Sequence, residues 1–278
     1  MRQLYILLIL TLLSSCSPKI GSTIISKQNP LSDSEMVLVL QKEDTFVNDG
    51  IEIGSIKSGD NGLSMNCTYN EIIEKLRQLA RQNGANIIKI TEQKSPDLWS
   101  TCERIKAQIY KVPDFRKYEK EIVWTRNRKL TWDDFKGKPK TISNTNVAAT
   151  TYCGFGFETN QVFVFSKVKL FTKNVFDCNL SWVRPDQKDK IPVLEHEQGH
   201  FDLCEVYARQ LRKKLEDKKL TAFTLNGDAN AIFKEIWALC LERQELYEKE
   251  TNYGLDRQKQ YEWATTIEKE LLELNAYS

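Results

Sequence analysis

Hydrophobic and polar residues in the first third of the chain alternate as expected of a small domain that combines strands with one helix. Four apolar runs are predicted strands, because residues two apart lie on one face of a strand: 36–41, 51–57, 86–91 and 104–110. A helical repeat of apolar residues follows Thr68 and Glu71, which match a capping box, and stops at Asn83-Gly84. The pattern predicts a small α+β accessory domain over residues 35–113.

The second half of the chain has a different pattern, with two β runs followed by three long helices. Residues 144–158 and 161–171 are apolar and aromatic runs separated by Thr159-Asn160, which suggests a hairpin. Apolar residues then recur at helical spacing in three segments: 191–218, 228–249 and 256–274. These elements predict a second α+β domain over residues 120–278, and the charged segment from Val112 to Lys120 marks the boundary.

The first residues have the pattern of an export signal rather than of a fold. Arg2 precedes an apolar run from Leu4 to Leu13, which is too short to span a bilayer. Leu13-Ser14-Ser15-Cys16 resembles a bacterial lipobox, which implies a signal peptide over residues 1–15, cleavage before Cys16 and lipidation of that cysteine. The alternative is an ordinary signal peptide with a coincidental cysteine.

Two further expectations follow from the lipobox. Ser17, rather than an acidic residue, follows Cys16, and by analogy with lipoprotein sorting this favours the outer membrane of a Gram-negative bacterium. Acyl chains on Cys16 would tether the protein to a membrane without spanning it. Residues 16–34 are rich in Ser, Lys, Asn and Pro without periodicity, so they are predicted to be a flexible tether.

The charge of the chain is nearly balanced, with 40 basic and 38 acidic residues and a net charge of +2. No broad polyanion-binding surface is implied, so we expect no nucleic-acid partner. The apolar fraction of 41% and the charged fraction of 28% are ordinary for a globular protein.

Seven cysteines are present, and six remain if Cys16 is lipidated. An even number of cysteines in an oxidising compartment favours disulfides. The simplest pairing joins neighbours in the sequence: Cys67 with Cys102, Cys153 with Cys178, and Cys204 with Cys240. For Cys204 and Cys240 the alternative is a pair of buried free thiols, because both fall on apolar faces of predicted helices.

The clearest chemical signal is His196-Glu197-Gln198-Gly199-His200, which contains both histidines of the chain. Residues four apart lie on one face of a helix, where two imidazoles can hold one Zn²⁺. Glu197 lies about 100° further round the helix. It is therefore better placed beside the open position of the metal, as a general base, than as a ligand. The alternative is two surface histidines on a charged helix.

A catalytic zinc needs a third protein ligand as well as an open position. Glu205 is out of phase with His196 on the helix and should face away. The remaining candidates are acidic residues downstream: Glu242, Glu245, Glu248 and Glu250. The segment Glu250–Gly254 resembles the acidic-x-x-Tyr-Gly segment of the aspzincin peptidases, with Glu in place of Asp. We therefore predict Glu250 as the third ligand and Tyr253 as a hydrogen-bond donor to the oxyanion.

Residues 121–278 carry four motifs, in order, that resemble the DUF922 family: Leu130-Thr131-Trp132-Asp133-Asp134-Phe135-Lys136-Gly137, Ser181-Trp182-Val183, the segment from His196 to Asp202, and the segment from Tyr247 to Gly254 with Gln260 and Trp263 beyond. Members of this family are bacterial secreted proteins regarded as zinc-dependent proteases. They usually carry Asp at the position of Glu248 and His at that of Tyr253. The resemblance implies a zincin-like α+β fold for this part of the chain.

The leading hypothesis is a membrane-anchored zinc metallopeptidase whose substrate is a peptide or protein. The hairpin before the histidine helix would offer an edge to an extended peptide. A rival hypothesis is a non-catalytic binding or assembly lipoprotein of the cell envelope with a structural or vestigial zinc site. A third is hydrolysis of a non-protein amide, such as cell-wall peptide.

Overall fold

The computed structural model describes residues 18–60, 67–97, 100, 102–139, 147–160, 169–218, 220–221 and 224–278. The chain divides into an N-terminal unit that ends at Tyr118 and a C-terminal unit that begins at Glu119, within the charged segment from Val112 to Lys120. Both units contain helices and strands, which confirms the α+β class. The predicted signal peptide over residues 1–15 and the predicted lipidation residue Cys16 lie outside the described residues.

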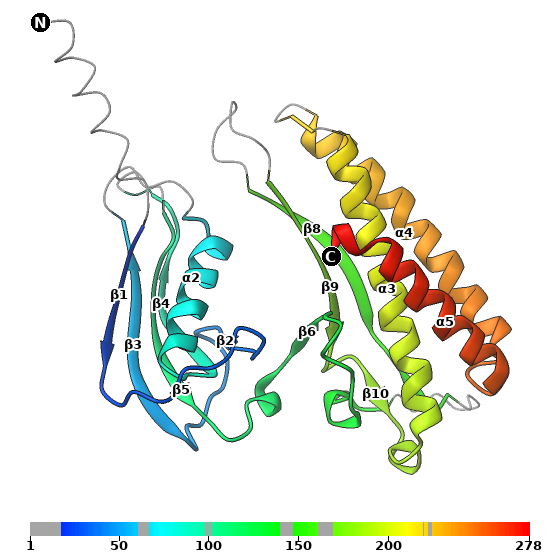
Figure 1. Cartoon of the computed structure of the whole chain (residues 1–278), viewed down its shortest axis with the longest axis horizontal. Coiled ribbons are helices and arrows are strands. Elements are labelled where there is room, and N and C mark those ends of the chain that lie inside the picture. The colour runs from blue at the N-terminus through cyan, green and yellow to red at the C-terminus, as the bar shows by residue number, and fades with distance from the viewer. Residues whose placement is uncertain are drawn as a thin grey trace, which may run out of the picture. The chain divides into compact units, whose positions relative to one another are not determined.

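In its described residues the N-terminal unit is a five-stranded sheet with one α-helix against it (Figure 1). The strands run in the order β1 (Lys19–Ile24), β3 (Ile51–Gly59), β5 (Arg104–Lys111), β4 (Ile87–Lys94) and β2 (Leu38–Leu40). Neighbours are antiparallel except β2 and β4, which are parallel. Helix α2 (Tyr69–Gln82) begins at the predicted capping box, where Glu71 accepts hydrogen bonds from the backbone and side chain of Thr68.

Residues near the N-terminus of this unit contradict the predicted flexible tether over residues 16–34. Lys19–Ile24 forms β1, paired along its whole length with β3. Further on, the backbone N–H groups of Gln28 and Leu31 donate to carbonyl oxygens at the end of α2. The prediction failed because an edge strand is held by backbone hydrogen bonds, which do not require the side-chain alternation that the sequence lacks here.

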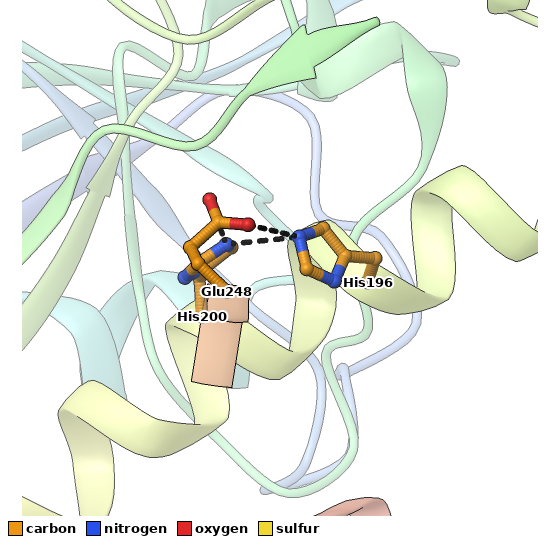
Figure 2. A group of neighbouring side chains, drawn as sticks. All are labelled: His196, His200 and Glu248. Atoms are coloured by element: carbon orange, nitrogen blue, oxygen red, sulfur yellow. Dashed lines mark hydrogen bonds and ion pairs between the residues drawn. The ribbon is translucent and has the colours of Figure 1, made fainter. Parts of the chain in front are cut away.

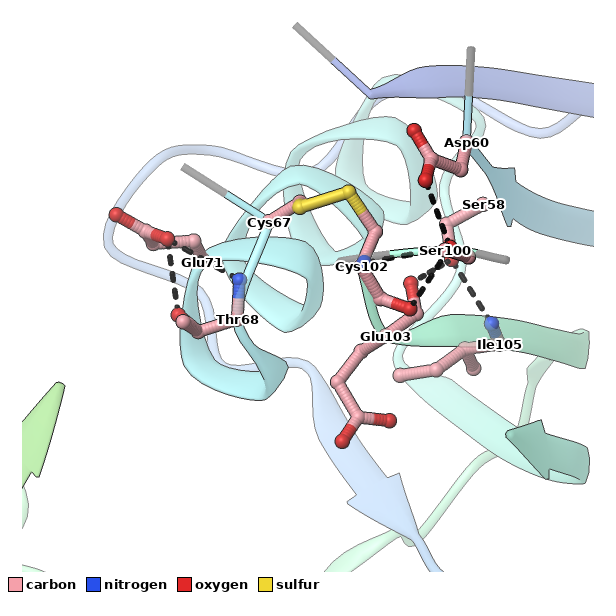
Figure 3. Close-up of a disulfide and its surroundings, with 9 residues drawn as sticks. All are labelled: Ser58, Asp60, Cys67, Thr68, Glu71, Ser100, Cys102, Glu103 and Ile105. Carbon is pink, nitrogen blue, oxygen red and sulfur yellow. Dashed lines mark hydrogen bonds between the residues drawn. A yellow bond between two sulfur atoms is a disulfide. The ribbon is translucent and has the colours of Figure 1, made fainter. Parts of the chain in front are cut away.

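A disulfide closes one end of the N-terminal unit (Figure 3). Cys67 stands just before α2 and Cys102 just before β5, and their bond confirms the first predicted pair. Nearby, Glu103 donates its backbone N–H to the Cys67 carbonyl oxygen at 3.0 Å, and Ile105 N–H donates to Ser58 Oγ at 2.8 Å. The bond therefore joins the start of the helix to the sheet that it covers.

The C-terminal unit places three long helices beside two small sheets. The strands are β6 (Glu121–Val123), β9 (Lys169–Asp177) and β8 (Cys153–Asn160), in that order in one sheet, and β7 (Ala149–Thr150) paired with β10 (Trp182–Val183) in the other. The helices are α3 (Ile191–Asp217), α4 (Leu225–Glu250) and α5 (Arg257–Glu273). Helix α3 contacts β8 and β9 as well as α4 and α5, so it is the central element of this unit (Figure 1).

The described residues also form short 3₁₀ helices: η2 (Arg116–Tyr118), η3 (Trp132–Asp134), η4 (Pro185–Gln187) and η5 (Asn275–Tyr277). Among the described residues, no helix has the length and apolar character needed to cross a membrane.

The predicted hairpin is present, but its turn is not at Thr159-Asn160. Strands β8 and β9 pair antiparallel from Cys153 opposite Phe176 to Asn160 opposite Lys169. The two residues predicted as the turn therefore belong to β8, and the predicted second run over 161–171 overlaps β9 only from Lys169. Residues 161–168 lie outside the described part of the chain.

The two remaining predicted disulfides are absent: Cys153, Cys178, Cys204 and Cys240 are free thiols. Cys178 is buried, and this burial raises the pKa of its thiol to about 12. Cys153 on β8 faces Cys204 on α3 instead, with 3.2 Å between the two sulfur atoms. The pairing predicted from sequence proximity failed because α3 packs across β8 and brings residues about fifty positions apart into contact.

Candidate metal centre

The first turns of α3 place both histidines on one face of the helix. Pro192 stands in the first turn, where its missing N–H costs no hydrogen bond. His196 Nε2 and His200 Nε2 lie 3.2 Å apart, and their rings are nearly perpendicular. The helical spacing therefore has the consequence predicted from the sequence: two imidazole nitrogens converge on one point (Figure 2).

The third residue of the cluster is Glu248, not the predicted Glu250. Glu248 Oε2 lies 3.3 Å from His196 Nε2, and Glu248 Oε1 lies 3.3 Å from His200 Nε2. Figure 2 shows the carboxylate between the two rings. Glu250 is exposed and instead accepts a hydrogen bond from Trp263 Nε1 at 2.9 Å. Residues two positions apart on a helix point in directions that differ by about 200°, so only one of these two glutamates can face α3.

The three side chains have the spacing that a tetrahedral metal requires. One ligand atom from each of His196, His200 and Glu248 lies within 4.8 Å of the other two, and no other such group of three occurs among the described residues. Ligands about 2.0–2.1 Å from a tetrahedral zinc lie about 3.3–3.4 Å from one another. The two imidazole nitrogens, 3.2 Å apart, match this value, and each lies 3.3 Å from one oxygen of the Glu248 carboxylate, Oε2 for His196 and Oε1 for His200. Glu248 Oε2 is also buried without a hydrogen-bond donor, so it retains a lone pair for a cation.

The electrostatics of the cluster also favour a cation. Burial raises the pKa of Glu248, but the adjacent rings of His196 and His200 outweigh this effect and lower the pKa to about 2. Burial lowers the pKa of His200, but Glu248 and the nearby charge of Glu197 outweigh this effect and raise it. The carboxylate is therefore ionised at neutral pH, and its negative charge is concentrated where the two nitrogens meet.

Two glutamines are hydrogen-bonded to the Nδ1 atoms of the two histidine rings. Gln260 Oε1 lies 3.1 Å from His196 Nδ1, and Gln244 Oε1 lies 2.6 Å from His200 Nδ1. Neither was predicted as a site residue, although Gln260 stands within the family motif. The signal that could have found them is the need of a metal-binding histidine for an acceptor at its second nitrogen.

The contacts of these glutamines fix the protonation of both rings. Gln244 Nε2 donates to the His200 carbonyl oxygen at 3.0 Å, and a carbonyl oxygen only accepts. The other end of Gln244 is therefore the acceptor Oε1, and His200 Nδ1 carries the proton that it receives. This arrangement leaves His200 Nε2 as the nitrogen directed toward Glu248.

The same reasoning applies to His196 through a tyrosine. The Tyr247 hydroxyl donates to the His196 carbonyl oxygen at 3.1 Å, so it must accept from Gln260 Nε2 at 2.5 Å. Gln260 Oε1 then faces His196 Nδ1, which carries the proton. The Tyr247 ring also stacks on His196, with centroids 4.8 Å apart, and burial raises the pKa of its hydroxyl.

Two glycines allow this close packing. A Cβ on Gly199 would lie 2.2 Å from the Tyr247 hydroxyl oxygen, which explains a glycine between the two histidines. A Cβ on Gly254 would lie 2.8 Å from His196 Cγ, and Gly254 has a φ of 78°. Asn252 and Tyr253 before it also have positive φ. The turn after α4 is therefore pressed against the first histidine.

The cluster opens into a cavity of about 1260 Å³. Glu197, which is 95% buried, lines this cavity together with all three cluster residues. The predicted Tyr253 also lines it, with 73% of its surface exposed, so it stands at the mouth rather than in the interior. The first two predicted ligands, the predicted base and Tyr253 thus share one cavity, and Glu250 is outside it.

One wall of the cavity is a short strand and not the hairpin that we expected to offer an edge. Residues 147–151 line the cavity and contain β7, which pairs on one side with β10. Within the described part of the chain, the other side of β7 has no partner strand. Thr151 Oγ1 donates to the Glu197 carbonyl oxygen at 3.2 Å, which fixes this segment against the histidine helix.

Comparison with protein families gives one match. The model of the DUF922 family, described as a bacterial protein of unknown function, matches residues 190–254. This segment contains the histidine motif and Glu248, and the match supports the family resemblance seen in the sequence. No curated protein and no solved structure matches the chain.

Proposed function

We propose that the C-terminal unit is a zinc-dependent metallopeptidase. The observation that carries the proposal is the cluster of two histidines and one carboxylate, close enough to share one metal ion, in the wall of a large cavity that also contains Glu197. Three protein ligands leave one position open, as catalytic zinc sites require. A structural site would be expected to close that position with a fourth protein ligand, and the cluster has three members among the described residues.

In this proposal the three cluster residues and four neighbouring side chains each have a role. His196 Nε2, His200 Nε2 and Glu248 would hold the metal, and Gln260 and Gln244 keep both rings in the required tautomer. A bound zinc would polarise the scissile carbonyl and lower the pKa of a water molecule. Glu197 would act as the general base and then as the general acid that protonates the leaving amine. Tyr253, at the mouth, donates a hydrogen bond to the oxyanion.

The substrate in this proposal is an extended peptide. Strand β7 lines the cavity that contains Glu197, and within the described part of the chain one of its sides has no partner strand; an extended backbone can pair with such an edge. Apolar residues at the mouth would contact the flanking side chains of the substrate; Val147, Ile191, Tyr253 and Leu255 are large, exposed and line the cavity. The proposal also retains the lipid anchor at Cys16 and, with it, a place on the cell envelope.

The test is cleavage of a peptide mixture by the purified protein containing one equivalent of zinc, followed by mass spectrometry. We expect cleavage that a chelator abolishes and that added zinc restores. Glu197→Gln should lower the rate by about 10²–10⁴-fold, because it removes the general base, while zinc stoichiometry stays at one.

Two results would refute the proposal. Cleavage that persists at the original rate in Glu197→Gln would exclude this glutamate as the base. Zinc binding by the wild-type protein without cleavage of any peptide would favour a binding protein of the cell envelope instead.

A further inference from the structure

Three of the free cysteines gather on the side of α3 that faces β8 and α4. Cys204 lies on α3 in the turn after His200, Cys153 begins β8, and Cys240 lies on α4. Cys204 and Cys240 are buried, whereas Cys153 is only partly buried. The fourth free thiol of the unit, Cys178, lies instead near charged residues such as Lys136 and Asp134.

The two sulfur atoms of Cys153 and Cys204 are almost close enough to bond. They are 3.2 Å apart, and a disulfide bond is about 2.05 Å long. The difference of about 1.2 Å is of the size by which rotation of the two cysteine side chains about χ1 moves their sulfur atoms.

The cysteine pair also contacts the backbone of His200 and the glutamine that is hydrogen-bonded to the His200 ring. The Cys153 thiol lies 3.7 Å from the His200 carbonyl oxygen, and Cys204 Sγ accepts from Gln244 Nε2 at 3.4 Å. Gln244 is the residue that accepts from His200 Nδ1. One amide thus joins the cysteine pair to the imidazole.

We propose that Cys153 and Cys204 are a redox-active pair that a small-molecule disulfide oxidises reversibly to an intramolecular disulfide. The Cys153 thiolate attacks one sulfur of the oxidant and releases one small thiolate. Cys204 then attacks Cys153 Sγ and releases the second. Two S–H bonds and one S–S bond of the oxidant are exchanged for one protein S–S bond and two small-molecule thiols, so two electrons pass to the oxidant.

The partial exposure of Cys153 sets the order of these steps. An oxidant from solvent reaches Cys153, whereas Cys204 is 97% buried and meets only a sulfur that is already in the protein. The new bond would close a loop across 51 sequence positions and join β8 to α3 in the helical turn that follows His200.

The first experiment uses the purified wild-type protein without added metal. It is equilibrated in buffers of increasing ratio of oxidised to reduced glutathione, then alkylated, digested and analysed by mass spectrometry. We expect Cys153 and Cys204 to lose alkylation together and to appear as one linked peptide that is lighter by two hydrogen atoms. Cys178 should remain alkylated after denaturation across the whole series, and reduction should restore both labels.

Single substitutions of the cysteines show which two of them form the disulfide. Cys153→Ser should leave Cys204 as a free thiol that is alkylated and unlinked, whereas Cys178→Ser, the matched control in the same unit, should oxidise like wild type. Cys240→Ser should also retain the link. A link between Cys204 and Cys240, a stable adduct of Cys153 with the oxidant, or full alkylation of both cysteines at every ratio would each overturn the proposal. The wild-type measurement decides the matter even where a variant fails to fold.

Discussion

The interiors of the two units differ in what they bury. The core of the N-terminal unit consists largely of isoleucine and other aliphatic residues, and a disulfide joins its helix to its sheet. The C-terminal unit buries aromatic residues together with charged and polar groups that include His196, Glu197, Glu205, Arg209 and Gln260. Its described cysteines are free thiols.

The two units therefore differ in how much their stability depends on buried polar groups. Burying a polar group is unfavourable unless it is hydrogen-bonded. In the C-terminal unit several of these buried groups are hydrogen-bonded to one another: Glu205 pairs with Arg209 at 3.0 Å, and Gln260 bridges His196 and Tyr247. The N-terminal unit has no metal cluster among its described residues and gains stability from aliphatic packing and a cross-link. The three predictions that follow test this contrast.

The largest expected effect is the loss of metal affinity in Glu248→Ala. Apparent zinc binding free energies of about 10–16 kcal/mol, divided among the three protein ligands of this cluster, amount to about 3–5 kcal/mol for each, so removal of one ligand should weaken binding by about 10³-fold. Competition with a chromophoric chelator measures this change. Glu250→Ala is the matched control on the same helix, because its carboxylate contacts Trp263 and is outside the cluster. Equal losses in the two variants would contradict the assignment of Glu248.

The second effect concerns the N-terminal unit alone. Replacing Cys67 and Cys102 by Ser removes a cross-link across 35 positions, which should lower the free energy of unfolding of this unit by about 3 kcal/mol. Hydrogen exchange with mass spectrometry resolves the two units in the whole chain. We expect faster exchange in β4 and β5 and unchanged exchange in α3. Equal acceleration in α3 would show that the two units do not unfold independently.

The smallest effect is expected at the glutamine behind His196. Gln260→Leu removes the acceptor of His196 Nδ1, and loss of such a partner weakens metal binding by about 10–100-fold. It should also leave His196 in a mixture of tautomers. The chain has two histidines, so ¹⁵N spectra of the imidazoles report each ring directly in the metal-free protein.

Gln258→Leu on the same helix is the control for Gln260→Leu, since Gln258 is exposed and contacts Glu262. An unchanged His196 tautomer in Gln260→Leu, together with unchanged zinc affinity, would show that Gln260 serves packing alone.

Much of the fold could be predicted from the sequence, because the sequence patterns that indicate it lie within short segments. The capping box of Thr68 and Glu71, the start of α3 near Pro192 and the paired faces of His196 and His200 each depend on residues within one helical turn. Helix geometry fixes the separation of such residues whatever surrounds them. The Cys67–Cys102 bond was also predicted, since both cysteines stand at the same ends of neighbouring elements.

The tertiary structure alone decided the rest of the site. Glu248 rather than Glu250, the glutamines Gln244 and Gln260, and the contact of Cys153 with Cys204 all depend on how α4, α5 and β8 pack against α3. A rotation of α4 by one residue turns its side chains through about 100° and would present a different one to the histidines. The sequence by itself determined that two imidazoles share one helix face; the packing of distant elements decided which groups complete their coordination and hold their protons.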